Sequence, residues 1–468
     1  MRDKLFAPTP IYTLVWLRVA MGLLGAGDII GNGIYYHWHL DSFSGFTFRY
    51  YGFEWVHPLP EPFLSLFFIV GFLLGIAVAL GWRFRYTAPA FALCFSYLYF
   101  LEKAHYLNHA YLFMTLAWLL CMTPAWREFS LGVRRRPGDW SPVAPAWSVY
   151  VFPALMGVVY FFGGIAKINY DWLIEAMPLH MWLQNRGEMP VLGLLFKLKV
   201  TAYVMAWGGM LLDLTAGFLL CHRRLRWVAL ALLLFFHATN HLIFNIGIFP
   251  YLSLVLTSMF FAPDWPKRLV DWLAGSRFHF ARARVQSWRG EWQRRVNPTP
   301  EHRTGVLARK RPFWQSETRY QLFIAVGLAL LFCVELFLPL RHNYFSSDVN
   351  WTEVGHRYSW RMMLRSKQGY GDYRLLDRVT GEEWEVDPLD SLTSKQYRKM
   401  ATHPGMILQY AHHLRNQYAA AGRDVEVYAR FKVRLNGRTR QRFTDDTVDL
   451  AREEWTWREN TWVLPEVR

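Results

Sequence analysis

A long apolar segment of the chain ends in Tyr160-Phe-Phe-Gly-Gly-Ile-Ala-Lys-Ile-Asn-Tyr-Asp-Trp172, and a single lysine, Lys167, stands at its end. A lysine at the end of a membrane-spanning helix often only extends its ammonium group to the interface. In apolar surroundings it can instead act as a base, because burial lowers its pKa from the usual value of about 10.4. Asp171 lies four residues further on and could pair with Lys167, which would raise that pKa. Spacing alone leaves both roles open.

The composition indicates an integral membrane protein. Of the 468 residues, 53% are hydrophobic and 18% aromatic, more aromatic than is usual for a soluble protein of this length. The formal net charge is +16, but much of the basic charge lies in loops between apolar runs. Membrane topology explains such a distribution better than nucleic-acid binding does. We therefore expect the lipid bilayer as a partner, and no nucleic acid.

Apolar segments that are long enough, or nearly long enough, to cross a bilayer recur nine times. Arginine-rich loops follow the second, fourth, sixth and eighth segments, and the richest loop runs from Lys267 to Arg311. In a nine-span count all these loops lie on one side, which the positive-inside bias makes cytoplasmic. The segments are 11–34, 63–82, 87–103, 107–124, 146–166, 200–221, 227–245, 247–262 and 320–340.

The fold class predicted from these patterns is an α-helical polytopic membrane protein, with about nine transmembrane helices and a C-terminal extramembrane β-rich domain. That domain is expected on the periplasmic or outer side of the membrane. If the protein is bacterial, this membrane is the inner (plasma) membrane. The expected parts are a transmembrane domain with the active site (1–264), a basic cytoplasmic amphipathic segment (265–318), a last transmembrane helix (319–340) and the β-rich domain (341–468). In that domain, alternation and turn residues predict strands at Tyr373–Val379, Trp384–Val386, Val425–Leu435 and Arg440–Phe443, and a helix at 393–421.

Polar groups within the apolar segments are costly and need a reason. Asp213 follows two small residues, Gly208 and Gly209, which allow a neighbouring helix to approach closely. We interpret Asp213 as a hydrogen-bonding group toward such a neighbour rather than as a catalytic residue.

Histidines in the apolar segments raise the question of a metal site. His105 and His109, like His237 and His241, are four residues apart, so each pair shares one helical face. Membrane di-iron oxidases use several such pairs with carboxylates beside them, and the chain lacks a full set. The four cysteines all lie within or at the ends of apolar runs and form no CxxC motif. We expect no metal, and a di-iron oxidase stays an alternative.

The segment around Lys167 resembles the active-site lysine region of the vitamin K-dependent γ-glutamyl carboxylases. The similarity continues in the same order over nearly the whole chain, which is identified as a bacterial-type member with a shortened C-terminal region. The blocks that carry it are Leu107-Asn-His-Ala-Tyr-Leu112, Gly164–Trp172, Gly208–Leu220, Phe236-His-Ala-Thr-Asn240 through Tyr251, Asn350-Trp-Thr352, Tyr358–Met363, Gln409-Tyr-Ala411 and Leu435-Asn-Gly-Arg438.

The resemblance implies a mechanism and a set of residues. A reduced quinone, vitamin K hydroquinone or menaquinol, reacts with O2 to give a strong base, which takes the γ-proton of a peptidyl glutamate. CO2 then adds to the carbanion, the quinone leaves as its epoxide, and the partner is a peptide or protein carrying the glutamate. The residues implied are Lys167 and His109 as catalytic, Asn108, Trp172, His237, Asn240, Met362 and Met363 at the cofactor, and Tyr358, Trp360, Arg365 and Arg438 at the substrate.

The chain also departs from the family's animal members. It has Ala166 where they have a second lysine, and no cysteine that could join the membrane part to the outer domain. Quinone oxygenation is therefore the firmer expectation, and an epoxidase without carboxylation is the second. A non-enzymatic quinone- or lipid-binding membrane protein is a further alternative.

Overall fold

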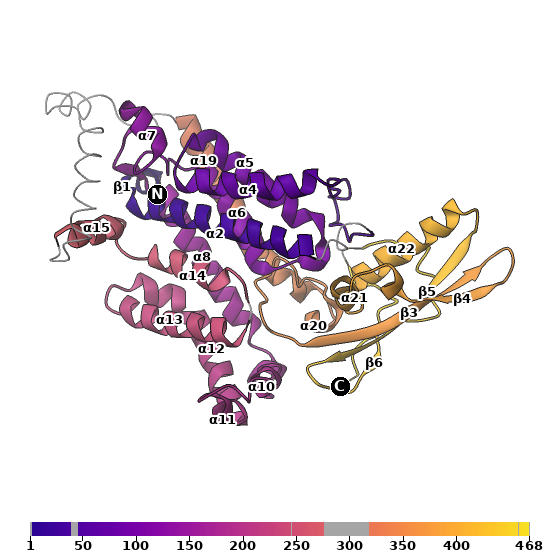
Figure 1. The fold of residues 1–468 in the computed structure, drawn as a ribbon. Helices are drawn as coiled ribbons and strands as arrows, with labels where there is room; N and C mark the ends of the chain where they lie inside the picture. Colours follow the sequence, from indigo (N-terminus) through magenta and orange to yellow (C-terminus); the bar gives the residue numbers. More distant parts are fainter. Residues whose placement is uncertain (1, 39–44, 245, 276–317, 457, 468) are drawn as a thin grey trace.

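The computed structural model describes residues 2–38, 45–244, 246–275, 318–456 and 458–467. Helices make up the N-terminal part, and a sheet with two helices makes up most of the C-terminal part, which lies at one end of the helical bundle (Figure 1). Of the predicted basic segment 265–318, only the start, within α15 (Trp265–Gly275), and residue 318 fall in the described part of the chain. The bundle helices are α2 (Tyr12–Trp38), α4 (Phe63–Ala79), α5 (Phe84–Leu101), α6 (Asn108–Cys121), α8 (Ala146–Ala166), α12 (Lys199–Cys221), α13 (Arg226–Ile243), α14 (Phe249–Ser258) and α19 (Thr318–Leu340).

Five stretches in the described residues are helical, long and apolar enough to cross a membrane. They are Tyr12–Ile34, Ala146–Ala166, Lys199–Cys221, Arg226–Ile243 and Thr318–Tyr344. Helices α4 and α14 are apolar but have only 17 and 10 residues, so they fall short of the usual spanning length of about 20. The prediction of an integral, mainly helical membrane region is confirmed, whereas the count of nine spans stays a prediction.

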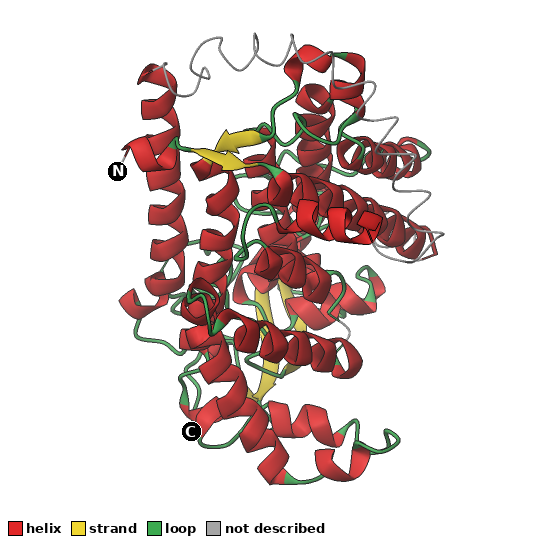
Figure 2. Cartoon of the chain, turned by 90° about the vertical axis from the view of Figure 1, so that its left-hand side faces the viewer, coloured by secondary structure: helices red, strands yellow, loops and turns green. Residues whose placement is uncertain are grey.

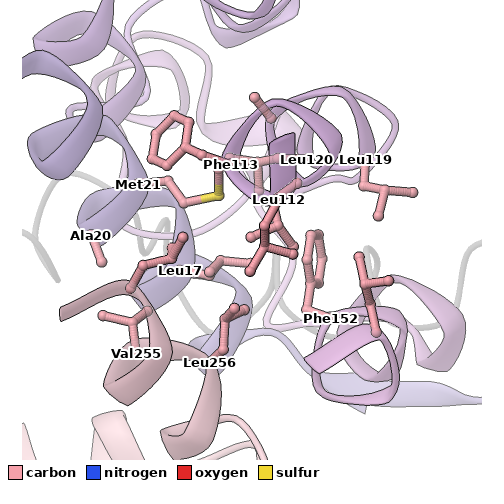
Figure 3. Packing of buried hydrophobic residues seen from close by; sticks show 14 of the residues in the cluster. Leu17, Ala20, Met21, Leu112, Phe113, Leu119, Leu120, Phe152, Val255 and Leu256 are labelled. Carbon is pink, nitrogen blue, oxygen red and sulfur yellow. The ribbon is translucent and has the colours of Figure 1, made fainter. Parts of the chain in front are cut away.

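Large apolar side chains fill the centre of the bundle. Leu17 and Met21 of α2 meet Leu112 and Phe113 of α6, and Phe152 of α8 packs beside them (Figure 3). All five side chains are fully buried. This contact joins helices distant in sequence and fixes the frame on which the polar groups of the bundle are held.

The basic loops meet at the end of the bundle away from the C-terminal sheet. There β1 (Pro8–Pro10) pairs with β2 (Val143–Pro145), as Figure 2 shows. Buried Arg18 donates hydrogen bonds to the carbonyl oxygens of Ala125 and Glu128 at 2.8 and 3.2 Å. The loop after α4 is tied to the same segment by Leu131 N, which donates to Leu80 O at 2.9 Å. The loops after α4 and α6 thus lie together, whereas most of the richest basic loop falls outside the described residues, and the common side of all four loops stays a prediction.

The C-terminal part is built on an antiparallel sheet in the order β4-β3-β5-β6. Its central pair runs from Lys367 opposite Leu435 to Asp377 opposite Val425. Tyr410 and Ile407 of α22 belong to the buried core that also holds Phe431 of the sheet. The elements are β3 (Lys367–Asp377), β4 (Glu383–Val386), α21 (Ser394–Met400), α22 (Pro404–Ala420), β5 (Val425–Leu435) and β6 (Gln441–Arg442).

Several polar contacts join the sheet domain to the bundle. The Asn436-Gly437 turn after β5 has positive φ at both residues, as a tight hairpin requires, and it carries Asn436 Nδ2 to within 2.6 Å of Asp171 Oδ2. Arg438 forms an ion pair with the same carboxylate and a second one with Glu466, at 2.7 Å. On another side, Gln396 of α21 donates to Glu102 at 2.8 Å. These contacts link two domains that no disulfide joins, since all four cysteines are free.

We predict that Arg438→Gln loosens this joint. The change removes charged hydrogen bonds to Asp171 and Glu466, each contributing about 1.5–3 kcal/mol. The expected result is a lower midpoint of thermal unfolding in detergent and faster proteolysis between the two domains. Arg434→Gln is the matched control, because Arg434 lies on the adjacent strand and bonds to the amide oxygen of Gln368. Equal behaviour of the two variants would contradict the assignment.

Candidate active site

A cavity of about 1070 Å³ lies at the end of the bundle that faces the sheet domain. Its walls come from α6, α8, α12, α13 and α14, and segment 356–365 and α21 close it from the sheet domain. Most of the wall is apolar, with a small number of converging polar groups, as is typical of small-molecule sites. Nine of the predicted residues line it: Asn108, His109, Lys167, Trp172, His237, Asn240, Met362, Met363 and Arg365.

Lys167 lies between the end of one helix and the start of the next. Helix α8 ends at Ala166, and Lys167 forms its C-cap. Asn169 then begins the short helix α9 (Tyr170–Leu173), because its side chain accepts a hydrogen bond from Trp172 N at 3.0 Å. The turn between the helices leaves the lysine side chain facing the cavity, with its Nζ 5.8 Å from the centre of the Trp172 ring.

Asp213 of α12 is the partner of Lys167. Lys167 Nζ donates to Asp213 Oδ2 at 2.6 Å and to Gly163 O at 3.1 Å. Both side chains are buried, 8% and 7% exposed, so water screens the pair little. Asp171 does not pair with Lys167, contrary to the alternative raised from its spacing, because its carboxylate is bound by Asn436 and Arg438. Asp213 does hydrogen-bond toward a neighbouring helix, as the sequence predicted, and its partner is Lys167 at the end of α8.

Gly164 allows the two helices to come this close. A Cβ atom at this position would lie 2.7 Å from the backbone nitrogen of Leu214, the residue that follows Asp213. We predict that Gly164→Ala forces α8 and α12 apart, costs about 1–3 kcal/mol in folding free energy and lengthens the Lys167–Asp213 contact.

The same substitution elsewhere on α8 is the control for this prediction. A Cβ atom at Gly157 would meet nothing within 4 Å, so Gly157→Ala should keep or slightly raise thermal stability, by up to about 1 kcal/mol from helix propensity. The measurement is the midpoint of thermal unfolding in detergent, followed for both variants. If Gly164→Ala is as stable as Gly157→Ala, the close helix approach is not required.

Histidine and asparagine side chains form the opposite polar part of the wall. Asn108 accepts a hydrogen bond from Tyr106 at 2.8 Å and donates to the carbonyl oxygen of Arg361 at 3.0 Å, so its amide is fixed. His237 Nε2 lies 3.1 Å from Tyr160 Oη, and His237 Nδ1 is buried without a partner in the structure. His109 and Asn240 also reach the cavity surface. These groups can hydrogen-bond a polar ring substituent within an otherwise apolar chamber.

The segment from Tyr358 to Met363 has an unusual backbone. Tyr358, Trp360 and Met363 have φ of 59°, 55° and 53°, and a left-handed conformation costs a residue with a side chain about 1–3 kcal/mol. Packing compensates for the cost: Trp360 is fully buried, and its ring centroid is 5.4 Å from that of Tyr111. The geometry places Met362 and Met363 in the cavity wall, whereas Tyr358 and Trp360 are not among its lining residues.

Two cationic residues expected at the substrate already have acidic partners. Arg365 lines the cavity, but its Nε donates to Glu353 at 2.9 Å and its Nη2 forms an ion pair with the same carboxylate. Arg438 is not among the lining residues and is bound by Asp171 and Glu466. We therefore correct the assignment of Arg438 to the domain joint. Arg365 keeps only part of its hydrogen-bonding capacity for a substrate.

Comparison with protein families accounts for this architecture. Residues 6–265 match the model of the HTTM domain, which is more than half of the chain. Residues 320–468 match the lumenal domain of vitamin K-dependent gamma-carboxylase. The chain belongs to the vitamin K-dependent gamma-carboxylase family. It is an integral membrane protein with a lumenal-type C-terminal domain. No solved structure matches the chain.

Several lining residues of this carboxylase-family cavity were not singled out from the sequence. They are mostly basic and belong to the side that faces the sheet domain: Lys103, His356, Arg357, Arg361, Lys395, Lys399 and His403. All seven lie outside the long helices of the structure, although Lys103 ends the predicted apolar segment 87–103 and Arg361 lies in the block Tyr358–Met363. Nothing in the local sequence marks them, because only the fold brings the η1 turn (Lys103–His105), segment 356–361 and α21 together.

The described residues contain no group of three or more His, Cys, Asp or Glu side chains placed to hold a metal ion. His109 and His237 do line the same cavity, although they come from different helices. His241, the second member of the later pair, has its Nε2 3.5 Å from Tyr251 Oη.

Proposed function

We propose that this family member oxygenates a reduced naphthoquinone, vitamin K hydroquinone or menaquinol, to its epoxide and couples that reaction to carboxylation of a peptidyl glutamate. The observation that carries the proposal is the buried Lys167–Asp213 pair in the wall of a large apolar cavity. A buried amine that can hand its proton to a partner is suited to begin a reaction by taking a proton from a hydroxyl group.

The residues present fit a quinone. The cavity volume of about 1070 Å³ is at the upper end of the range for small-molecule sites, as a ring with an isoprenoid tail requires. Phe236, Phe249 and Trp172 contribute aromatic wall, and the unpartnered Nδ1 of His237 is a polar atom for an oxygen substituent. Asn108, Asn240, Met362 and Met363 would complete the contact surface.

When bound, the reduced quinone supplies, with O2, the strong base that removes the glutamate γ-proton, which no side chain is basic enough to take, and CO2 then adds at that carbon. Moving the proton of Lys167 Nζ to Asp213 Oδ2 across their 2.6 Å hydrogen bond leaves a neutral amine. That amine accepts a hydroxyl proton from the ligand, and His109 hydrogen-bonds the negative charge that results. Segment 356–365 and α21 line the side of the chamber that faces the sheet domain.

Epoxide formation without carboxylation is the second candidate. The observation that favours it is the engagement of Arg365 by Glu353 and of Arg438 by Asp171 and Glu466. These are the two cations expected to hold the substrate, and a carboxylate already occupies each of them. Carboxylation therefore requires other groups to bind the glutamate.

The product of the quinone tests the proposal. Protein purified in detergent, given reduced vitamin K and O2, should convert the quinone to its epoxide, as measured by chromatography against a heat-inactivated sample. Menaquinol serves as the second quinone. If neither yields epoxide above the inactivated control, with or without a glutamyl peptide, the proposed chemistry is wrong.

A further inference from the structure

The cavity carries more positive than negative charge. Among the described residues that line it, seven are Lys or Arg and two are Asp. Asp213 is used by Lys167, and Asp28 lies on α2, where it accepts a hydrogen bond from Asn32. The remaining cations all belong to the side that faces the sheet domain. This side is therefore suited to an anionic ligand.

Lys103 and Arg361 are the buried cations on this side, with 8% and 7% of their surface exposed. Lys103 follows the end of α5, in the η1 turn (Lys103–His105), which packs against α21 of the sheet domain. The residue lines the cavity, and its Nζ has no hydrogen-bond or ion-pair partner in the described part of the chain. Glu102 and Glu54 act on this ammonium group electrostatically, but neither forms an ion pair with it among the described residues, so an anion beside it would be stabilising.

Arg357 acts electrostatically on both Lys103 and Lys399, and α21, which carries Lys399, packs against the η1 turn. Burial and then Arg357 lower the pKa of Lys103 to about 7. Lys399 remains open to solvent, so it stands at the mouth, whereas Lys103 lies inside. The two domains thus each supply one lysine to the same opening.

The carboxylates near the two lysines are hydrogen-bonded to other groups. Glu54 accepts a hydrogen bond from Gly52 N at 2.9 Å. Glu102 accepts hydrogen bonds from Phe48 N at 3.2 Å, from Ala104 N at 2.8 Å and from Gln396 at 2.8 Å. Glu353 is bound by Arg365 and lies 3.4 Å from Lys367 Nζ. Arg361 adds a further buried donor, since its Nε has no partner in the structure.

We propose that Lys103 and Lys399, with Arg357, form a carboxylate-binding site at the cavity mouth that holds an acidic side chain of the incoming peptide. The site rests on the proposed function and supplies the peptide contact that Arg365 and Arg438 do not offer. Bicarbonate shares the same planar oxyanion chemistry. We assign the peptide because the site opens to solvent at Lys399 and spans both domains.

Direct binding tests the site independently of catalysis. The probe is a fluorescently labelled pentapeptide with two adjacent glutamates, titrated with full-length protein in detergent, and the same peptide with two glutamines is the ligand control. The combined variant Lys103→Gln, Lys399→Gln should raise the Kd of the glutamate peptide at least about tenfold and leave the weak binding of the glutamine peptide unchanged. Lys432→Gln, at an exposed position on β5, should behave as the wild type.

Three outcomes would overturn the assignment. One is an unchanged Kd in the combined variant, measured at wild-type thermal stability. Another is failure of the charge-preserving variant Lys103→Arg, Lys399→Arg to restore affinity in a folded protein. The third is an unchanged peptide Kd with a higher bicarbonate concentration for half-maximal label fixation, which would make bicarbonate the occupant. Charge-dependent peptide binding without any epoxide formation would instead support this binding site and contradict the proposed function.

Discussion

Replacing Lys167 with alanine should reduce epoxide formation from reduced vitamin K by about 10²–10⁴-fold, the usual contribution of a positioned general base. The lysine is the buried amine whose hydrogen bond to Asp213 allows a proton to be passed on. Alanine leaves Asp213 in place but removes the group that accepts the hydroxyl proton. The measurement is the initial rate of epoxide formation at saturating quinone.

Two comparisons make this result specific to Lys167. Lys432→Ala, at an exposed position on β5, should keep the wild-type rate. Lys167→Arg preserves the positive charge but cannot readily lose its proton, because the guanidinium group stays charged under all ordinary conditions. It should therefore be as inactive as the alanine variant. Wild-type activity in the arginine variant would show that charge, not proton transfer, is what the reaction needs.

The second large effect is expected on stability. Asp213→Ala leaves the ammonium group of Lys167 buried with only the carbonyl oxygen of Gly163 beside it, 3.1 Å away. Breaking a buried ion pair from one side typically costs about 3–5 kcal/mol. Asp213→Asn keeps the shape but cannot take up a proton. It should retain more stability than the alanine variant while losing activity.

Removing both charges separates folding from chemistry. The combined change Lys167→Met, Asp213→Leu eliminates the buried charges, and well-packed apolar replacements of an ion pair are often neutral or stabilising. We expect its midpoint of thermal unfolding to return to near that of the wild type, without epoxide formation. If the double variant is as unstable as Asp213→Ala, the stability lost in Asp213→Ala does not come from leaving the charge of Lys167 buried without a partner.

The sequence predicted the lysine but not its partner, and the reason is geometric. Asp171 is four residues from Lys167, which puts two side chains together only within a continuous helix. Helix α8 ends before Lys167, so Asp171 belongs to α9 and contacts the sheet domain instead. Asp213 is 46 positions away, and only the packing of α12 on α8 brings it to the lysine.

In the sheet domain, the predicted strand bounds match the structure where strand propensity and strand pairing favour the same residues. Val425–Leu435 alternates cleanly and is β5 as predicted. Strand β3 begins at Lys367, before the predicted Tyr373, because pairing with β5 overrides the low strand propensity of Gly369 and Gly371. The single helix predicted at 393–421 is two helices in the structure. Pro404 begins α22, and a proline there cannot continue the helix of α21.

Residues at the cavity mouth could not be predicted from local patterns. Lys103 and Lys399 lie outside the long helices of the structure, and their significance depends on the contact between η1 and α21 across nearly 300 positions. Arg438 shows the converse: its motif was recognised, but its guanidinium group serves the domain joint. Sequence motifs indicate which segments lie near a site, whereas the role of each residue there depends on its tertiary contacts.

We propose that the cavity beside Lys167 couples quinone oxygenation to carboxylation. The most direct measurement follows both products in one sample: wild-type protein in detergent with reduced vitamin K, O2, labelled bicarbonate and a glutamate-containing peptide. We predict that epoxide and peptide-bound label form together and that Lys167→Ala abolishes both. Epoxide without peptide-bound label would support an epoxidase that does not carboxylate. The absence of both products from a folded wild-type protein would contradict both functions.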